Sequence, residues 1–83
     1  MIQVQLRYFA SIREALGCGS ESWQTSALTV GELRSELLQR GESFQCLAPE
    51  KPVRMALNQL MVQGNAALTE CCEVGFFPPV TGG

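Results

Sequence analysis

Hydrophobic and polar residues alternate strictly at the start of the chain. Every second residue from Ile2 to Tyr8 is hydrophobic, and the residues between them are Gln3, Gln5 and Arg7. Successive side chains of a strand point to opposite faces, so a period of two is typical of a strand with one buried face. The opening segment is therefore predicted to be a half-buried strand.

A short helix is predicted next, over residues 9–17. Ser11 and Glu14 have the spacing of a capping box, in which two side chains bond the free N–H groups at a helix start. Gly17 suits the left-handed conformation that ends many helices. Residues 21–25 then form a weaker strand, which we expect to pair with the first.

The clearest local signal in the chain is the start of a second helix. Thr29 and Glu32 form another capping box. Leu28 and Leu33 occupy the two positions of a hydrophobic staple, a contact that fixes how the chain enters a helix. Both signals place the first helical residue directly after Thr29.

This second helix is predicted to run from Val30 to Arg40. Leucines follow Val30 at three- and four-residue spacing as far as Leu37, the pattern of a helix that buries one face. Glu36 precedes Arg40 by four residues, the order in which an ion pair along a helix is favourable. Gly41 then ends the helix.

The remaining half of the chain is predicted to form strands. Residues 42–52 are irregular and interrupted by two prolines. Residues 53–62 are apolar and strand-like, with a hairpin turn at 58–59. A turn at 64–65 and a last strand over 73–77 follow. The order of elements implies an α+β domain, with a mixed sheet of about five strands packed on one main helix.

Length and charge limit the possible partners. A chain of 83 residues forms one domain. Its net charge is −2, and six Lys and Arg residues are scattered rather than gathered into the basic patch that a nucleic-acid binder needs. No apolar run has the length to span a bilayer, and the first residues lack the pattern of a signal peptide. The sequence predicts a cytoplasmic protein that binds neither nucleic acid nor membrane.

The four cysteines and the lack of histidine bear on chemistry. Cys18, Cys46, Cys71 and Cys72 show no C-x-x-C spacing, so we predict reduced thiols rather than a disulfide scaffold or a metal site. Histidine is the usual general base and the usual partner of a nucleophile. The chain is therefore not expected to be catalytic alone.

The end of the chain has an unusual composition. Pro78 and Pro79 stop the last strand, because proline cannot donate to a ladder, and they stiffen the exit from the sheet. Gly82 and Gly83 have no side chains and can enter a narrow channel.

We divide the chain into a body, residues 1–77, and an extended tail, residues 78–83, that carries the function. The alternative is a frayed terminus without a role, although such termini are usually polar. A terminal carboxylate is ionised at neutral pH and is a poor electrophile. It must be activated before it can carry a group, most simply by adenylation with ATP. The chain has no phosphate-binding loop, so a separate enzyme would do this.

These residues resemble a known family. The resemblance is carried by the segments 9–14, 29–33 and 56–58, and above all by the ending from Glu73 to Gly83, which contains the run Phe-Phe-Pro-Pro-Val-Thr-Gly-Gly. The chain resembles the small, sulfur-carrying subunit of molybdopterin synthase, a β-grasp (ubiquitin-like) protein. A Gly-Gly end alone is shared by all ubiquitin-like carriers, whereas the full run is specific.

The resemblance implies a function for the tail. An E1-like adenylyltransferase would use ATP to adenylate Gly83. A cysteine desulfurase or rhodanese-like sulfur donor would then convert the adenylate into a thiocarboxylate. This chain itself would bind no cofactor and no metal.

The resemblance also implies a partner and a substrate. The tail would enter the large catalytic subunit of the synthase, giving a heterotetramer, and pass sulfur to cyclic pyranopterin monophosphate to form the molybdopterin dithiolene. The residues expected to bind this partner are Phe76, Phe77, Pro78, Pro79, Val80, Thr81 and Gly82.

Two details of this region stay open in the sequence. The turn before the last strand is usually acidic-Gly in the family, and here it contains Cys71 and Cys72. We interpret these as structural, with a sulfur relay to the tail as the alternative. Phe76 and Phe77 face opposite sides of their strand, so one should be buried and one exposed, unless a curved sheet buries both.

Three other functions are compatible with a Gly-Gly tail. The nearest is a sulfur carrier for thiamine synthesis or tRNA thiolation. The second is a ubiquitin-like modifier joined to lysines of other proteins through Gly83. The third is an interaction module with an inert tail.

Overall fold

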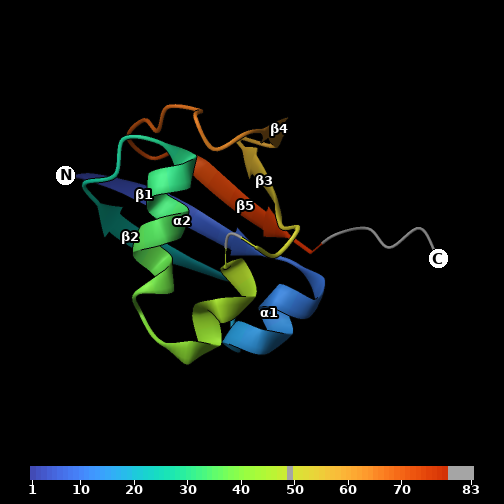
Figure 1. Ribbon diagram of the computed structural model, residues 1–83. Coiled ribbons are helices and arrows are strands. Elements are labelled where there is room, and N and C mark those ends of the chain that lie inside the picture. The colour runs from blue at the N-terminus through green and yellow to red at the C-terminus, as the bar shows by residue number, and fades with distance from the viewer. Residues whose placement is uncertain (49, 79–83) are drawn as a thin grey trace.

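The computed structural model describes residues 1–48 and 50–78 (Figure 1). Within them, one five-stranded sheet is packed against two α-helices and a 3-10 helix, η1. The elements, in chain order, are β1 (Ile2–Tyr8), α1 (Ala10–Leu16), β2 (Ser20–Thr25), α2 (Val30–Leu38), η1 (Glu42–Leu47), β3 (Arg54–Leu57), β4 (Leu60–Val62) and β5 (Glu73–Phe77).

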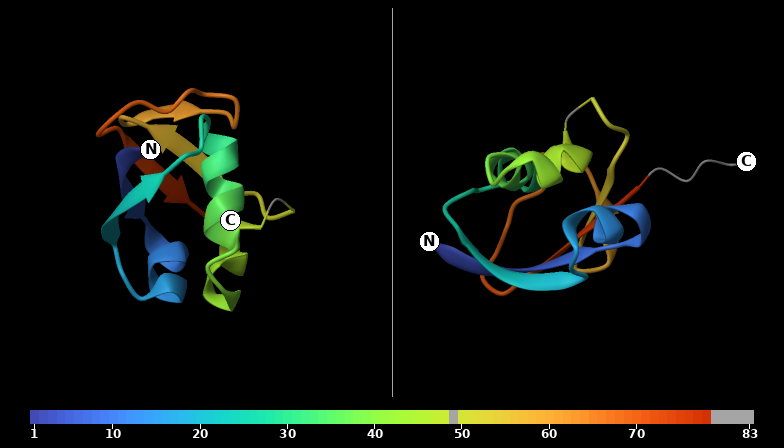
Figure 2. Two further views of the ribbon diagram at one scale, coloured as in Figure 1. Left: turned by 90° about the vertical axis from the view of Figure 1, so that its left-hand side faces the viewer. Right: turned by 90° about the horizontal axis from the view of Figure 1, so that it is seen from below.

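The strands lie in the order β2-β1-β5-β3-β4. The first and last strands, β1 and β5, are parallel neighbours in the middle of the sheet, and the other pairs are antiparallel. Figure 2 shows α2 and η1 lying over one face of this sheet. The predicted α+β class, mixed sheet and single main helix are confirmed, and together they form the β-grasp arrangement.

The core lies between β1, β5 and α2. Val4 and Leu6 of β1 are fully buried, as are Leu33 and Leu37 of α2 and Val74 of β5. The side chains between them on β1 are exposed, so the predicted period-two strand is confirmed. A buried face of this kind fixes strand register, because a slip of one residue would expose every core side chain.

The start of α2 is confirmed in part. The Thr29 hydroxyl accepts a hydrogen bond from the Glu32 N–H at 3.2 Å. Glu32 reaches one residue further back than a capping box requires and accepts from the Leu28 N–H at 2.9 Å. The predicted staple between Leu28 and Leu33 is wrong, because Leu28 is 71% exposed. The Leu28 carbonyl accepts a hydrogen bond from the Leu68 N–H at 2.9 Å, so the backbone of Leu28 pairs with another loop while its side chain points to solvent.

The end of α2 differs from the prediction in its ion pair. The helix ends at Leu38, and Glu36 does not pair with Arg40. Glu36 accepts hydrogen bonds from the Trp23 indole at 2.7 Å and the Thr25 hydroxyl at 2.6 Å, both on β2. Arg40 instead donates to Glu21 of β2 at 2.7 Å. The reason is that α2 lies against β2, so cross-element partners replace the neighbour along the helix.

The short helix α1 begins earlier than its capping pattern indicated. It starts at Ala10 with Phe9 as its N-cap, and no side chain caps it, so the predicted Ser11–Glu14 capping box is wrong. Phe9 follows the last residue of β1, and its N–H donates to the Phe76 carbonyl of β5 at 3.2 Å. The helix therefore follows directly after β1. Gly17 ends it in the left-handed conformation, as predicted.

Residues 42–62 combine a missed helix with a confirmed hairpin. The segment predicted to be irregular contains η1. The hairpin between β3 and β4 turns at Asn58 and Gln59, both with positive φ, which matches the twist of the flanking strands. The turn at 64–65 and the last strand over 73–77 are also as predicted.

Candidate functional site

The candidate site begins where β5 leaves the sheet. β5 lies between β1 and β3, and its last residue, Phe77, pairs with Arg54. Pro78 follows and is half-buried. The remaining predicted tail residues, Pro79, Val80, Thr81, Gly82 and Gly83, lie outside the described residues. The structure thus describes the base from which the tail leaves.

The two phenylalanines at this base have different surroundings. Phe76 is fully buried and stacks on Tyr8, with ring centroids 6.1 Å apart. Phe77 points to the opposite face of the sheet and is half-buried. Phe76 therefore stabilises the body and has no surface to offer, which leaves Phe77 as the aromatic that a partner can contact. The alternative in which a curved sheet buries both phenylalanines is therefore wrong.

Phe77 stacks on Phe9. Their ring centroids are 4.3 Å apart and the ring planes are nearly parallel, with an angle of 2° between them. Gly75 lies beneath the pair, where an added Cβ would come within 3.2 Å of the Phe9 ring and 3.3 Å of the Phe77 ring. The absence of a side chain at position 75 thus lets the two rings lie flat on the strand. These residues line a hollow of about 40 Å³, together with the buried Ala56 and with the polar residues Arg7, Gln59 and Glu73. We call Phe9, Ala56, Gly75 and Phe77 the tail-base surface.

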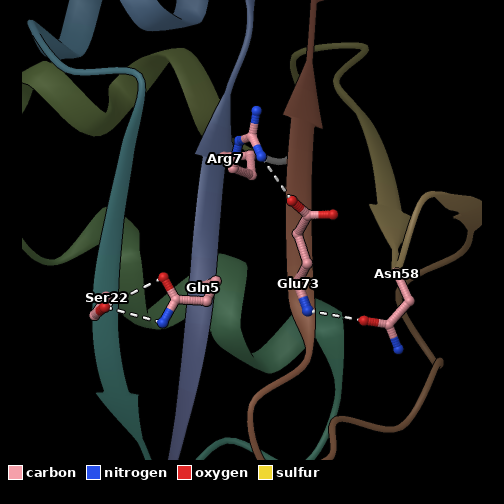
Figure 3. A network of polar contacts seen from close by, with 5 residues as sticks. All are labelled: Gln5, Arg7, Ser22, Asn58 and Glu73. Atoms are coloured by element: carbon pink, nitrogen blue, oxygen red, sulfur yellow. Dashed lines mark hydrogen bonds and ion pairs between the residues drawn. The ribbon is translucent and has the colours of Figure 1, made fainter.

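The same face of the sheet becomes polar away from the tail (Figure 3). Arg7 and Glu73 form an ion pair of 2.9 Å between β1 and β5. The Gln5 amide donates to the Ser22 hydroxyl at 3.0 Å, and the Glu73 N–H donates to the Asn58 side chain at 2.9 Å. The tail-base surface is therefore a small apolar area bordered by a polar sheet face, the composition of an interface core with a polar rim.

Sequence reasoning missed Phe9, Ala56 and Gly75 as members of this surface. The signal that identifies them is strand pairing. In the parallel pair, Tyr8 lies opposite Phe76, which brings Phe9 next to Phe77. Ala56 lies opposite Gly75 in the antiparallel pair. Local sequence patterns do not reveal which strands are neighbours, so these residues become visible only in the fold.

The cysteines do not gather at the tail base as a group. All four are free thiols. Cys71 and Cys72 precede β5, whereas the tail leaves after its far end, about 17 Å away for a five-residue strand. The two thiols therefore lie at the opposite end of β5 from the tail base. Cys46 lies in a separate hollow beside Pro78, and burial raises the pKa of its thiol.

Two further observations concern metal binding and membrane-spanning helices. Among residues 1–48 and 50–78, no group of three or more His, Cys, Asp or Glu side chains could hold a metal ion. In the same part of the chain, no helix combines the length and the apolar character needed to cross a bilayer.

The fold and the tail base together define a class: a ubiquitin-like β-grasp domain whose central last strand continues into a C-terminal tail. The chain belongs to the ThiS family, whose sequence pattern matches residues 6–83. This is a family of sulfur carriers.

Curated relatives span almost the whole chain. The molybdopterin synthase sulfur carrier subunit of Escherichia coli is 31% identical over 80 residues, 96% of this chain and 99% of that protein. The subunit of the same name from Haemophilus influenzae is 30% identical over 92% of this chain and 94% of its own length.

Solved structures agree with the fold. A putative molybdopterin converting factor subunit 1 from Pyrococcus furiosus superposes with a TM-score of 0.79 at 27% identity, covering 96% of this chain and all of that one. A chain in the complex of subunits 1 and 2 of molybdopterin-converting factor from Helicobacter pylori has a TM-score of 0.68 at 26% identity, covering 99% of this chain and 100% of that one. Small archaeal modifier protein 1 from Methanosarcina acetivorans, at 23% identity and a TM-score of 0.79, covers 100% and 98% and shares the fold.

Proposed function

We propose that this chain is the sulfur carrier subunit of a molybdopterin synthase. In this function Gly83 is adenylated, becomes a thiocarboxylate and donates its sulfur to cyclic pyranopterin monophosphate, forming the dithiolene of molybdopterin. The main support is that the two curated relatives of that name match the chain at 30–31% identity over nearly its full length. The Phe-Phe-Pro-Pro-Val-Thr-Gly-Gly ending adds the chemical group that the function needs.

The tail base supplies the structural support. β5 is hydrogen-bonded to a strand on each side and ends at Phe77. Pro78 fixes its own φ and cannot extend the ladder. A tail anchored in this way starts from a defined point and direction, which reduces the entropy lost when it enters a partner.

The chemistry divides between this chain and separate proteins. The Gly83 carboxylate attacks the α-phosphate of ATP in an E1-like adenylyltransferase, and pyrophosphate leaves. The outer sulfur of a persulfide, supplied by a cysteine desulfurase or a rhodanese-like protein, then attacks the carbonyl carbon. AMP leaves with the electron pair of the broken C–O bond, and a thiol reductant cleaves the S–S bond of the resulting acyl disulfide to leave the thiocarboxylate. This chain provides the acyl group, and the activating enzyme uses the ATP.

The tail-base surface is the proposed docking area for the large catalytic subunit. Aromatic side chains dominate the binding energy of interfaces, and Phe77 is half-buried on Phe9 with one face free of the core. The Helicobacter pylori structure is a complex of subunits 1 and 2 of molybdopterin-converting factor, which supports a partner of this kind. The buried Phe76 is not part of this surface.

The central test is a mass measurement on the full chain. The protein is co-expressed with an activating enzyme of this type and a sulfur donor, and its intact mass is determined. We expect a gain equal to the replacement of one oxygen by sulfur, located at Gly83 by fragmentation. A variant lacking Gly83 is the control and should gain nothing. An unchanged mass in the complete chain, with an activating enzyme shown to work on its own carrier, would refute the proposal.

A second test separates docking from folding. Phe77→Ala removes one half-buried ring of the stack with Phe9 and should weaken binding to the large subunit about 10- to 100-fold, as truncation of an aromatic hot spot does. Gln5→Ala, on the polar part of the same face, is the matched control and should bind normally. Urea denaturation shows whether each variant is folded. Equal affinities for the two variants would contradict the assigned docking area.

Genetic and gel experiments separate the rival functions. Loss of the gene should abolish molybdoenzyme activity and leave growth without thiamine and tRNA thiolation intact. The opposite result would favour a carrier for those pathways. Adducts that are stable in a denaturing gel and depend on Gly83 would favour a protein modifier. If deletion of residues 82–83 leaves the cell unaffected, the tail of this protein is inert.

A further inference from the structure

Arg54 is an exposed cation on the same side of the sheet as Phe77. It is the first residue of β3, and in the antiparallel pair with β5 it lies directly opposite Phe77. Side chains of directly opposed residues stand on one face of a sheet, with Cβ atoms about 5 Å apart. Arg54 therefore borders the tail-base surface.

Arg54 has no charged partner within residues 1–48 and 50–78. The two ion pairs found in these residues join Arg7 to Glu73 and Arg40 to Glu21. Arg54 also makes no side-chain hydrogen bond in the same part of the chain, whereas Arg7 and Arg40 each donate to a carboxylate. Arginine has five N–H donors and stays charged at any physiological pH. Those of Arg54 are therefore free for a group on another molecule.

This side of the sheet is positive, although the chain as a whole is acidic. Of the charged residues in the described strands, three stand on it: Glu73, which shares the face of Phe77 at an even spacing along β5, Arg7, which lies opposite Gly75, and Arg54. Two positive charges and one negative charge leave +1, against −2 for the whole chain. Because Glu73 is paired with Arg7, the excess positive charge is that of Arg54.

A hollow where β3 begins and β4 ends adds an apolar wall beside this cation. Its volume is about 470 Å³, it opens to solvent, and Arg54 lines it together with Met61 and Val62. Met61 is 57% exposed and lies opposite Ala56, a member of the tail-base surface. The hollow and the tail-base surface therefore adjoin each other across β3 and β4.

We propose that Arg54 and this hollow receive an acidic side chain, Asp or Glu, of the large catalytic subunit, an inference that rests on the proposed function. A carboxylate carries the single negative charge that balances this side of the sheet, whereas a phosphate group carries nearly two. A guanidinium can hold a carboxylate through two parallel N–H···O bonds, which fixes direction as well as distance.

The ion pair and the aromatic contact have different tasks in this arrangement. Phe77 lies in the apolar centre of the docking area and supplies most of the affinity. A contact at Phe77 alone leaves the carrier free to turn about that point, and a second contact on the neighbouring strand fixes its angle. A charge at the border of an interface also speeds encounter with a partner of opposite charge. Arg54 is thus a positioning residue for docking.

The first experiment measures binding of the full chain to its large subunit by calorimetry, at about 0.1 M and about 1 M salt. Arg54→Gln should raise the dissociation constant about 2- to 5-fold at the lower salt, as loss of an exposed ion pair does. The difference should vanish at the higher salt, where the screening length falls to ~3 Å. Gln24→Glu is the control, because it changes the net charge equally but lies on β2, three strands from β3, and should bind normally.

The second experiment identifies the acidic partner by charge reversal. Arg54→Glu should bind about 10- to 30-fold more weakly, because attraction is replaced by repulsion. Each surface carboxylate of the large subunit is then replaced by lysine, and one such variant should bind Arg54→Glu more tightly than it binds the natural chain. Urea denaturation shows that every variant is folded.

Three results would overturn this inference alone: Arg54→Gln binds like the natural chain at the lower salt, Gln24→Glu loses as much affinity, or no reversal in the large subunit restores binding of Arg54→Glu. A natural chain that does not bind the large subunit at all would overturn the proposed function, and this inference with it.

Discussion

At the scale of single residues, Cys71 adopts a backbone conformation that favours glycine. Its φ is 64°, in the left-handed region that favours glycine. The turn requires this conformation, because the Cys71 N–H donates to the Gln3 carbonyl at 2.7 Å and the Cys72 N–H donates to the Thr69 carbonyl at 3.2 Å. The family resemblance places an acidic-Gly sequence in this turn, and the structure explains that preference by the sign of φ.

We therefore predict that Cys71→Gly stabilises the protein. A non-glycine residue in the left-handed region costs roughly 1–2 kcal/mol, and the greater freedom of glycine in the unfolded chain offsets part of this. The free energy of unfolding should rise by about 0.5–1 kcal/mol in urea titrations. Cys71→Ala retains the strain and is the control. A glycine variant no more stable than the alanine variant would contradict this account.

At the scale of elements, Glu21 joins β2 to β1 and to the segment that follows α2. This β2 residue accepts hydrogen bonds from the Tyr8 hydroxyl of β1 at 2.8 Å and from Arg40, after α2, at 2.7 Å. Burial alone would raise the pKa of Glu21, but the hydrogen bonds from Arg40 and Tyr8 outweigh it and lower that pKa below its ordinary 4.5. Arg40 also lies over the rings of Trp23 and Phe44. The group links one edge of the sheet to the helical layer.

This lowered pKa predicts a pH dependence of stability. Folding favours the ionised carboxylate, so the stabilisation is present above the ordinary pKa of 4.5 and is lost as pH falls through the folded-state value. Glu21→Gln should lower the free energy of unfolding by about 1 kcal/mol at pH 7, a size typical of a partly exposed pair. The difference from the natural chain should shrink at pH 3. Glu14→Gln, on α1, is the control, and a pH-independent difference for Glu21→Gln would contradict the assignment.

At the scale of the whole molecule, the N-terminus and the end of β5 lie on opposite sides (Figure 1). β1 and β5 are parallel neighbours, so the chain enters the sheet at one end and leaves it at the other. Met1 is 88% exposed and lies far from the tail base. The turn with Cys71 is at the entry end of β5, away from Phe77. The tail base is thereby separated from both the N-terminus and that turn.

We predict that fusions at the two ends have opposite effects on sulfur loading. A domain fused before Met1 should leave thiocarboxylate formation within about twofold of normal, because it adds bulk far from the tail base. One alanine added after Gly83 should abolish it, because the carboxylate would no longer belong to a side-chain-free Gly-Gly end. Intact mass after incubation with the activating enzyme and a sulfur donor measures both. Loading of the extended chain would show that Gly83 is not the required acceptor.

The sequence by itself determined the elements whose signals are local. Alternation along β1, the Thr29 cap of α2 and the left-handed stop at Gly17 each depend on residues within one turn or one strand, so they survive in any fold that contains the element. The tail prediction rests on the same kind of signal, because proline restricts the backbone and glycine frees it through their own covalent structure.

Only the tertiary structure decided which residues meet across the sheet. It buried Phe76 against Tyr8 and left Phe77 on Phe9, it gave Glu36 partners on β2, and it brought Arg54 opposite Phe77. The physical reason is that these contacts join residues far apart in the chain. Their identity depends on strand order and register, which are fixed by burial of the whole core and not by any local pattern.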